Sequence, residues 1–165
     1  MNNQRTIIFP GSFDPLTNGH VDIVRRALLV FDRVLIGVLT NPSKQYLFST
    51  EERIDLVFQE FKSESERVVI KSFSGLLVDF AKQQGAEVVL RGLRAISDFD
   101  YEAQMALLNR KLSGNIETLF MVAREENSYI SSTLVKQVAP FGGDISALVP
   151  AHVRQALLKK YNLTK

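Results

Sequence analysis

The chain has 165 residues, of which 45% are hydrophobic, and a formal net charge of +2 at pH 7. This length suits one α/β domain with a sizeable core, and the near-neutral charge argues against a dedicated nucleic-acid-binding protein. The absence of cysteine excludes disulfides, a thiol nucleophile and cysteine-based metal sites. The first residues are polar and no apolar run approaches the roughly 18 residues of a membrane span. We therefore expect a soluble cytoplasmic protein with no signal peptide and no membrane partner.

The N-terminal stretch predicts a strand, a loop and a helix in succession. Residues 6–9 are apolar and β-branched, which is typical of a buried strand. Pro10 and Gly11 are expected to end this strand, because proline cannot donate to a ladder and glycine allows a sharp turn. After His20 the apolar residues recur at helical spacing, at Val21, Val24, Leu28 and Phe31. In an open parallel sheet such a loop lies at the carboxyl end of a strand, where these folds bind ligands.

The loop ends in Thr17-Asn18-Gly19-His20, directly before the predicted helix. It carries neither of the two common glycine-rich phosphate fingerprints, so an ordinary strand-to-helix turn is the alternative. Gly19 leaves room for a ligand to approach the backbone. His20 would direct a hydrogen-bond donor at whatever the positive end of the helix binds, and a phosphate suits that position.

The rest of the chain alternates strands with helices. Strands are predicted at 33–39, 67–70, 86–90 and 116–122, and helices at 49–61, 76–85, 98–112, 131–139 and 150–161. This alternation predicts a single domain over residues 1–165. Its fold class is α/β, Rossmann-like and doubly wound, with a five-stranded parallel sheet, helices on both faces and right-handed crossovers.

Basic residues follow several of the predicted strands. Lys44 lies in the second loop, and Arg91 and Arg94 flank Gly92 in the fourth. Three cations on the ligand edge of the sheet, with few acids to neutralise them, favour a polyphosphate site. Gly92 is expected to form a tight turn directly after its strand, so that the two arginines flank one anion. The alternative is that they form surface ion pairs with Asp98, Asp100 or Glu102.

A run of hydroxyl side chains, Ser131 to Thr133, follows the fifth strand and opens a helix. Serine and threonine are good N-caps, so a capping role would explain one of them. Three consecutive hydroxyls beside free backbone N–H groups also form a cradle for an anion.

These segments together resemble one known family. Thr17-Asn18-Gly19-His20 resembles the (H/T)-x-G-H signature of the nucleotidyltransferase superfamily, and G-S-F-D-P-L-T-N-G-H resembles the first motif of bacterial phosphopantetheine adenylyltransferases. N-P-S-K, R-G-L-R-A-I-S-D-F-D-Y-E and Y-I-S-S-T-L-V-K resemble the later motifs of that family, in the correct order. The resemblance covers the chain from about Ile7 to the last helix. At Ser12 the family commonly has threonine, but the hydroxyl is retained.

The resemblance implies a reaction and its components. ATP and 4′-phosphopantetheine would give dephospho-coenzyme A and pyrophosphate, a step of coenzyme A biosynthesis, in a homohexamer. The nucleophile is a phosphate that is already charged at pH 7, so direct in-line attack needs no strong base and no covalent intermediate. Mg²⁺ is expected as the cofactor, held mainly by phosphate and water rather than by protein ligands. Asp14, the acid nearest the phosphates, is interpreted as a turn residue before Pro15, and His152 as structural.

The resemblance also assigns residues to roles. The catalytic residues are His20, Lys44 and Arg91. The residues expected to bind ATP are Ser12, Phe13, His20, Gly92, Leu93, Arg94, Glu102, Asn127, Ser128, Tyr129, Ile130, Ser131, Ser132 and Thr133. The residues expected to bind the acceptor substrate are Ser12, Lys44, Leu77 and Arg91. Leu77, Met105 and Leu108 could line the pantetheine arm, although a place in the core is the favoured interpretation of these apolar side chains.

Three other functions stay open at this point. A different small nucleotidyltransferase, making a nicotinamide dinucleotide or a cytidylyl alcohol, would share T-x-G-H and the hydroxyl run but not the R-G-L-R segment. A non-catalytic nucleotide-binding module would have no need for His20, Lys44 and Arg91 together. An RNA-binding role is the weakest, because the charge is near neutral and basic and aromatic residues do not interleave.

Overall fold

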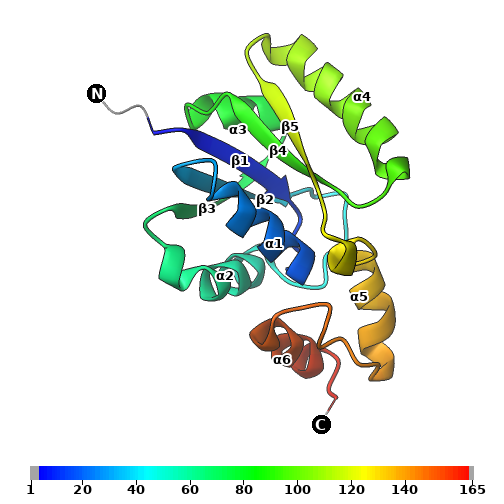
Figure 1. Ribbon diagram of the computed structural model, residues 1–165. Coiled ribbons are helices and arrows are strands. Elements are labelled where there is room, and N and C mark those ends of the chain that lie inside the picture. The colour runs from blue at the N-terminus through cyan, green and yellow to red at the C-terminus, as the bar shows by residue number, and fades with distance from the viewer. Residues whose placement is uncertain (1–3, 164–165) are drawn as a thin grey trace.

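Five parallel strands form the sheet of this protein, in the order β3-β2-β1-β4-β5 (Figure 1). The structure is a computed structural model that describes residues 4–163; the polar first three residues lie outside the described part. The strands are β1 Thr6–Gly11, β2 Arg33–Thr40, β3 Val68–Ser74, β4 Val88–Leu93 and β5 Glu117–Val122. The α-helices are α1 Asn18–Ala27, α2 Thr50–Glu60, α3 Leu77–Gln83, α4 Ile96–Ser113, α5 Ser132–Val138 and α6 Ala151–Lys160. The predicted doubly wound α/β fold is confirmed.

The side chains of the central strands alternate between two apolar layers. Ile7 and Phe9 of β1 face the layer that contains α1, α2, α5 and α6, whereas Ile8 faces the layer of α3. Both faces of β1 are therefore buried, which explains why its sequence is continuously apolar rather than alternating. Helix α4 lies on the α3 side of the sheet and projects beyond it at the upper right of Figure 1.

Two strands run further than the sequence predicted. β1 continues through Pro10 and Gly11, and β4 continues to Leu93, so that Arg91 and Gly92 lie in a strand rather than in a turn. The predicted tight turn at Gly92 is wrong. A Cβ atom at this position would stand 2.4 Å from Cδ1 of Ile23 in α1. A larger residue at this position would displace the Ile23 side chain, which lies directly against β4.

The sheet parts at its centre, between β1 and β4. Their register joins one residue of each strand, Ile8 and Val89, whereas β1 and β2 stay paired from Thr6 to Gly11. The crossovers leave β1 in one direction and β4 in the other, so this is the topological switch point of the fold. Beyond Ile8 the carboxyl ends of the two strands leave a crevice whose floor consists of the sheet itself.

Helix α4 differs from the other α-helices because none of its residues is buried. Even its large apolar side chains face solvent: Ile96 is 93% exposed and Leu107 is 69% exposed. A core position was favoured for Met105 and Leu108, but Met105 is partly exposed and Leu108 is 46% exposed, so that interpretation is wrong. Among the described residues, moreover, no helix has both the length and the apolar character that crossing a membrane requires.

The packing beneath β2 gives a test of the fold. Rings of Phe73 and Phe80 stack 4.4 Å apart, and a Cβ at Gly37 would approach them to 3.1 and 2.9 Å. We expect Gly37→Ala to lower the free energy of unfolding by about 1–3 kcal/mol, because overpacking forces the ring pair to shift. Urea denaturation measures this change. Leu29→Ala, at a side chain that is 85% exposed, is the control with about 0.5 kcal/mol or less. An unchanged midpoint for Gly37→Ala would contradict the stated packing.

Candidate active site

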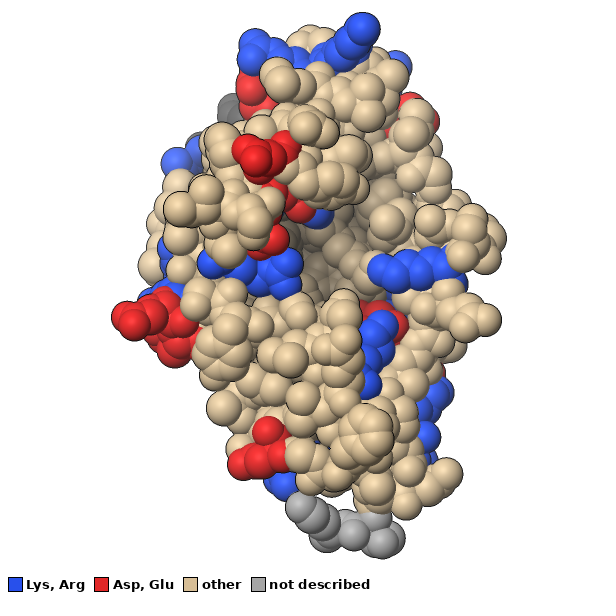
Figure 2. Space-filling model, turned by 90° about the vertical axis from the view of Figure 1, so that its right-hand side faces the viewer, with Lys and Arg blue, Asp and Glu red and all other residues tan. Residues whose placement is uncertain are grey.

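Two cavities open side by side at the switch point. The α1 cavity, about 290 Å³, lies at the N-terminus of α1 and reaches the start of α5. The α4 cavity, about 480 Å³, lies between α4, the start of α3 and the ends of β1 to β3. The residues that line both are Pro10, Gly11, Ser12, Lys44, Arg91 and Glu102. Figure 2 shows the face of the molecule that is hollowed, with Lys and Arg side chains at the edges of the hollow.

His20 takes part in a capping box at the start of α1. The Thr17 hydroxyl accepts a hydrogen bond from the His20 N–H at 3.4 Å, and the Thr17 N–H donates to His20 Nδ1 at 3.1 Å. An imidazole nitrogen that accepts an N–H bond carries no proton. The neutral ring of His20 therefore holds its hydrogen on Nε2, which is free to donate to a ligand in the α1 cavity.

The charge state of His20 follows from its surroundings. Burial disfavours the imidazolium, and the guanidinium groups of Arg94 and Arg91 repel it, so the pKa of His20 falls to about 4. At neutral pH the ring is an uncharged donor. Its position is fixed by Phe13, whose ring meets the imidazole edge-on with centroids 5.0 Å apart.

Phe13 is buried in an unusual backbone conformation. Its φ is +49°, a left-handed value that non-glycine residues seldom adopt. The ring is 1% exposed and packs between Phe9 and His20. This burial stabilises a loop conformation that would otherwise be unfavourable, and strain of this kind is concentrated at functional sites. The conformation brings Ser12 and His20 to the same cavity.

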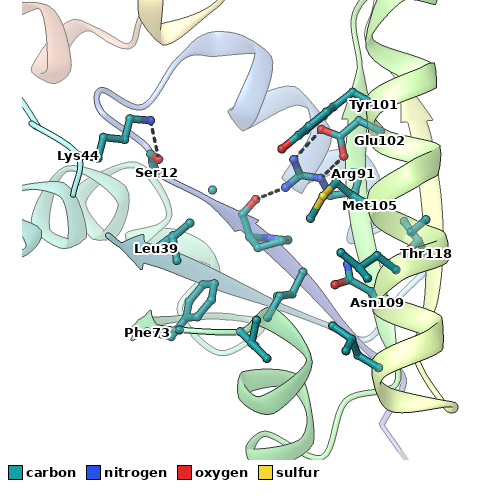
Figure 3. Close-up of a pocket in the computed structure, with 18 residues that line it drawn as sticks. Ser12, Leu39, Lys44, Phe73, Arg91, Tyr101, Glu102, Met105, Asn109 and Thr118 are labelled. Carbon is teal, nitrogen blue, oxygen red and sulfur yellow. Dashed lines mark hydrogen bonds and ion pairs between the residues drawn. The ribbon is translucent and has the colours of Figure 1, made fainter. Parts of the chain in front are cut away.

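The three predicted cations reach the cavities, but two of them are paired with acids. Arg91 donates from Nε and Nη2 to both oxygens of Glu102 at 2.7 Å, and from Nη1 to the Pro10 carbonyl at 3.0 Å (Figure 3). Arg94 binds the Asp98 carboxylate, its Nε lying 3.1 Å from Oδ2. The expectation of few neutralising acids is wrong, because α4 begins directly after β4 and brings its own carboxylates over the arginines.

Lys44 has a different environment. Its Nζ approaches the Ser12 hydroxyl at 3.5 Å (Figure 3). It also lies 5.6 Å from the centre of the Tyr46 ring. A hydroxyl and an aromatic face leave the positive charge of the ammonium group largely uncompensated. Lys44 is therefore the cation best placed to take up an anion at the junction of the two cavities.

The hydroxyl run takes the capping role that the sequence suggested, and its role as an anion cradle stays a prediction. The Ser131 hydroxyl caps α5 by accepting from the Leu134 N–H at 3.0 Å, and the Ser132 hydroxyl donates to the Pro15 carbonyl at 2.7 Å. The second bond fastens α5 to the loop after β1. The first backbone N–H groups of a helix have no partner within the helix. At α5 these groups lie beside the α1 cavity, which Ser131, Ser132 and Thr133 line.

Most residues that were assigned to substrates line the cavities. Those in the α1 cavity are Ser12, Phe13, His20, Lys44, Arg91, Gly92, Arg94, Glu102, Asn127, Ile130, Ser131, Ser132 and Thr133. Leu77, Met105 and Leu108 line the α4 cavity. Leu93, Ser128 and Tyr129 line neither, and the Ser128 hydroxyl instead donates to the Glu125 carbonyl at 2.7 Å. Ile130 is 3% exposed with its side chain in the core, so its backbone would have to make any contact.

Sequence reasoning missed Arg53, a buried arginine beneath the site. Its side chain is almost wholly buried, and its Nη1 donates to the carbonyls of Ser12 and Leu39 at 2.7 and 2.9 Å. It thereby joins the end of β2 to the loop after β1. A signal was present in the sequence: Arg53 lies three and four residues before Leu56 and Val57, on the apolar face of α2.

Sequence reasoning also undervalued Asp14. The interpretation as a simple turn residue is incomplete, because the side chain is buried. Its carboxylate accepts from the N–H groups of Leu47 and Phe48 and binds Lys136 Nζ at 2.8 Å. Both carboxylate oxygens are therefore engaged by groups of the protein itself. His152 is structural, as predicted: its Nε2 lies 2.9 Å from the Leu56 carbonyl oxygen.

A doubly wound sheet with cavities at its switch point is typical of a nucleotide-binding α/β protein. Residues 8–138 match the model of the family described as cytidylyltransferase-like. The chain is 53% identical over 155 residues to phosphopantetheine adenylyltransferase of Clostridium kluyveri, with 94% of each chain covered. It is 54% identical to the enzyme of the same name from Clostridium tetani, with 94% of this chain and 96% of the other covered. The chain therefore belongs to the phosphopantetheine adenylyltransferases of the cytidylyltransferase-like family.

Solved structures of lower sequence identity share the fold. A structure assigned as a nicotinate-nucleotide adenylyltransferase of Vibrio parahaemolyticus superimposes with a TM-score of 0.67 at 20% identity, covering 94% of this chain and 99% of that one. A bifunctional NMN adenylyltransferase/ADP-ribose pyrophosphatase of Francisella tularensis gives a TM-score of 0.71 at 14% identity, covering 96% of this chain and 52% of that one. At such identities the likeness concerns the fold alone.

The pKa of His20 leads to a prediction on pH. A histidine titrates near 6.5 in an unfolded chain and His20 at about 4 in the folded one. Between these values the unfolded state binds more protons, so the part of the unfolding free energy that depends on His20 is lost as the pH falls from 6.5 towards 4. Imidazole NMR should show a neutral ring with its proton on Nε2 from pH 6 to 8. A midpoint near 6.5 would contradict this environment, and His20→Gln should remove this part of the pH dependence.

Proposed function

We propose that this chain transfers AMP from ATP to 4′-phosphopantetheine, giving dephospho-coenzyme A and pyrophosphate. The names of its relatives support the activity. The observation that carries the mechanism is the junction of the two cavities, where Ser12, Lys44 and Arg91 line both. A reaction between two substrates requires such a meeting point.

Each cavity suits one substrate by its lining. The α1 cavity, with His20, Arg94 and the first turn of α5, would hold the phosphates of ATP. The α4 cavity is lined by apolar side chains such as Leu77, Met105 and Leu108, and would hold the pantetheine arm. The acceptor phosphate would then lie at the junction, between Lys44 and Arg91.

The chemistry is a single displacement. A phosphate oxygen of the acceptor attacks the α-phosphorus of ATP, the bond to the bridging oxygen breaks, and pyrophosphate leaves with that oxygen. His20 Nε2–H donates to a non-bridging oxygen on the α-phosphorus, where charge accumulates. A neutral donor suits this role because it keeps its proton throughout the reaction. Positioning supplies about 7–11 kcal/mol of barrier reduction, and each preorganised donor contributes about 10²–10³-fold in rate.

Arg91 would divide its hydrogen bonds when the acceptor binds. Its fork is now occupied by Glu102 and the Pro10 carbonyl. A phosphate oxygen competes well for such a fork, because guanidinium binds phosphate bidentately. Glu102 would then be released towards the nucleotide, in agreement with its expected role at ATP.

Mg²⁺ would enter with ATP as part of the substrate. Among the described residues, no group of three or more His, Asp or Glu side chains is arranged to hold a metal ion. Glu102 and Asp14 are engaged by Arg91 and Lys136. Phosphate and water would therefore be its main ligands, and the ion would stabilise the departing pyrophosphate.

We also propose that the chain assembles into a homohexamer and acts in the cytoplasm. Exposed apolar side chains on α4 and on the edge strand β5 support an assembly, among them Ile96, Leu107 and Val122, which are 93%, 69% and 65% exposed. Burying these side chains between copies would remove them from water.

The activity is tested by pyrophosphate release from ATP and Mg²⁺, with and without 4′-phosphopantetheine. We expect release only with the acceptor, and a loss of about 10²–10³-fold in kcat for His20→Ala, because the donor at the α-phosphorus is gone. Release with a different phosphorylated acceptor would leave the site and change the substrate. Near-native turnover of a folded His20→Ala protein would refute the assignment of His20.

The place of the acceptor phosphate is tested by Lys44→Ala and Arg91→Ala. Both should raise the KM for 4′-phosphopantetheine by about tenfold or more, since each removes a charged contact of about 1.5–3 kcal/mol. Steady-state kinetics with each substrate varied in turn measures the effect. Arg5→Ala, which removes an exposed arginine before β1 that is paired with Asp32, is the control with unchanged constants. An Arg91→Ala effect on ATP alone would contradict the placement.

A further inference from the structure

Asp14 lies outside both cavities, yet it contacts segments from each side of the site. Its side chain is about 2% exposed. It follows Ser12 and Phe13 in the loop after β1, and it faces the segment that ends in Phe48 and one face of α5. These three segments carry, respectively, Ser12, Lys44 and the hydroxyl run.

The contacts of the carboxylate are complete. Oδ1 accepts from the Phe48 N–H at 2.9 Å, and both oxygens lie 3.0–3.1 Å from the Leu47 nitrogen. Oδ2 also binds Lys136 Nζ at 2.8 Å. Burial alone raises the pKa of the Asp14 carboxyl, but the Lys136 ammonium and the two amides outweigh it and hold the pKa below its usual range. The group is therefore ionised at neutral pH.

The amide bonds restrain the chain close to Lys44. Leu47 is three residues beyond Lys44, and the turn that leads into Lys44 is closed by a hydrogen bond from the Lys44 N–H to the Asn41 carbonyl at 3.0 Å. Asn41 in turn donates its N–H to the Tyr46 hydroxyl at 3.0 Å. The segment from Asn41 to Phe48 is thus closed by internal hydrogen bonds, and its C-terminal end is anchored to Asp14. The ammonium of Lys44 contacts Ser12, which lies two residues before Asp14. The Lys44 side chain and the backbone of its segment are therefore both held by the loop after β1.

We propose that Asp14 is a positioning residue for the acceptor phosphate: through the amides of Leu47 and Phe48 it holds the segment that places Lys44 at the junction of the cavities. Lys136 keeps the carboxylate charged and in place from α5. The role of Lys44 in this inference rests on the proposed function. Asp14 itself touches no substrate.

A matched pair of double variants separates this role from the ion pair. Asp14→Asn/Lys136→Met removes both charges together and leaves an amide oxygen that accepts from the Leu47 and Phe48 N–H groups. Asp14→Ala/Lys136→Met is equally uncharged and offers no acceptor. Neither protein contains an unpaired buried charge, the condition that most endangers folding. Circular dichroism and thermal unfolding establish that both are folded before kinetics is measured.

We expect the KM for 4′-phosphopantetheine of the Ala variant to be about tenfold above that of the Asn variant. A change of this size is typical of the loss of a hydrogen-bond acceptor. The KM for ATP should differ between the two variants by less than about threefold. Arg5→Met, which breaks a pair with Asp32 in which both side chains are exposed, is the control for the loss of an ion pair and should match the wild type. Equal acceptor KM values for the two double variants, or an equal rise in both KM values, would overturn the proposal.

A double-mutant cycle with Lys44→Ala measures whether Asp14 acts through Lys44, and a merely structural role of Asp14 would give no such coupling. If Asp14 acts through Lys44, exchanging Asn for Ala at position 14 in the Lys136→Met background has little further effect once Lys44 is absent. Additive effects would show that Asp14 acts elsewhere. Wild-type protein that releases no pyrophosphate with 4′-phosphopantetheine would refute the proposed function instead, so the two failures are distinct.

Discussion

The parting of β1 and β4 is the constraint on which the site depends. Parallel strands that stayed paired to their ends would close the crevice, whereas these two share the Ile8–Val89 register and then separate. The gap is crossed by one side chain, because Arg91 of β4 donates to the Pro10 carbonyl of β1. That bond places a guanidinium group where both cavities meet, so the sheet topology and the proposed chemistry have the same geometric origin.

The electrostatics of the site rest on a division between a neutral donor and charged ones. Thr17 fixes the tautomer of His20, and burial together with the arginines keeps its ring uncharged. The Lys44 ammonium lies beside the Ser12 hydroxyl, while the Arg91 guanidinium is paired with Glu102. Two anionic substrates that enter the cavities would contact the cations Lys44 and Arg91, and the reacting phosphorus would lie beside the neutral donor His20. Such an arrangement stabilises developing charge without a proton transfer.

Much of this could be predicted from the sequence, and the reasons are local. Periodicity located the five strands and the six α-helices that the structure describes in residues 4–163, and the T-N-G-H stretch located the cap that carries His20. The prediction of a tight turn at Gly92 was wrong. This glycine leaves room for the Ile23 side chain of α1, which is distant in sequence, and no local pattern reveals that contact. The same holds for Asp14, whose partners Leu47 and Lys136 are 33 and 122 residues away.

The ion pairs of the arginines show a second limit of sequence reasoning. The spacing allowed Arg91 and Arg94 to bind either phosphate or the acids of α4, and only the placement of α4 over β4 decides in favour of Glu102 and Asp98. A helix with no buried residue gives no periodic signal of its position. The apolar side chains Met105 and Leu108 were assigned to a core for the same reason, although they line a cavity.

A crystal structure of the chain with α,β-methylene-ATP, Mg²⁺ and 4′-phosphopantetheine tests most directly whether the two substrates meet at the junction of the cavities. We predict the α-phosphate within hydrogen-bonding distance of His20 Nε2, and the acceptor phosphate between Lys44 and Arg91, with its oxygen opposite the α,β bridge. Nucleotide phosphates in the α4 cavity, or an acceptor phosphate remote from Lys44 and Arg91, would contradict the mechanism.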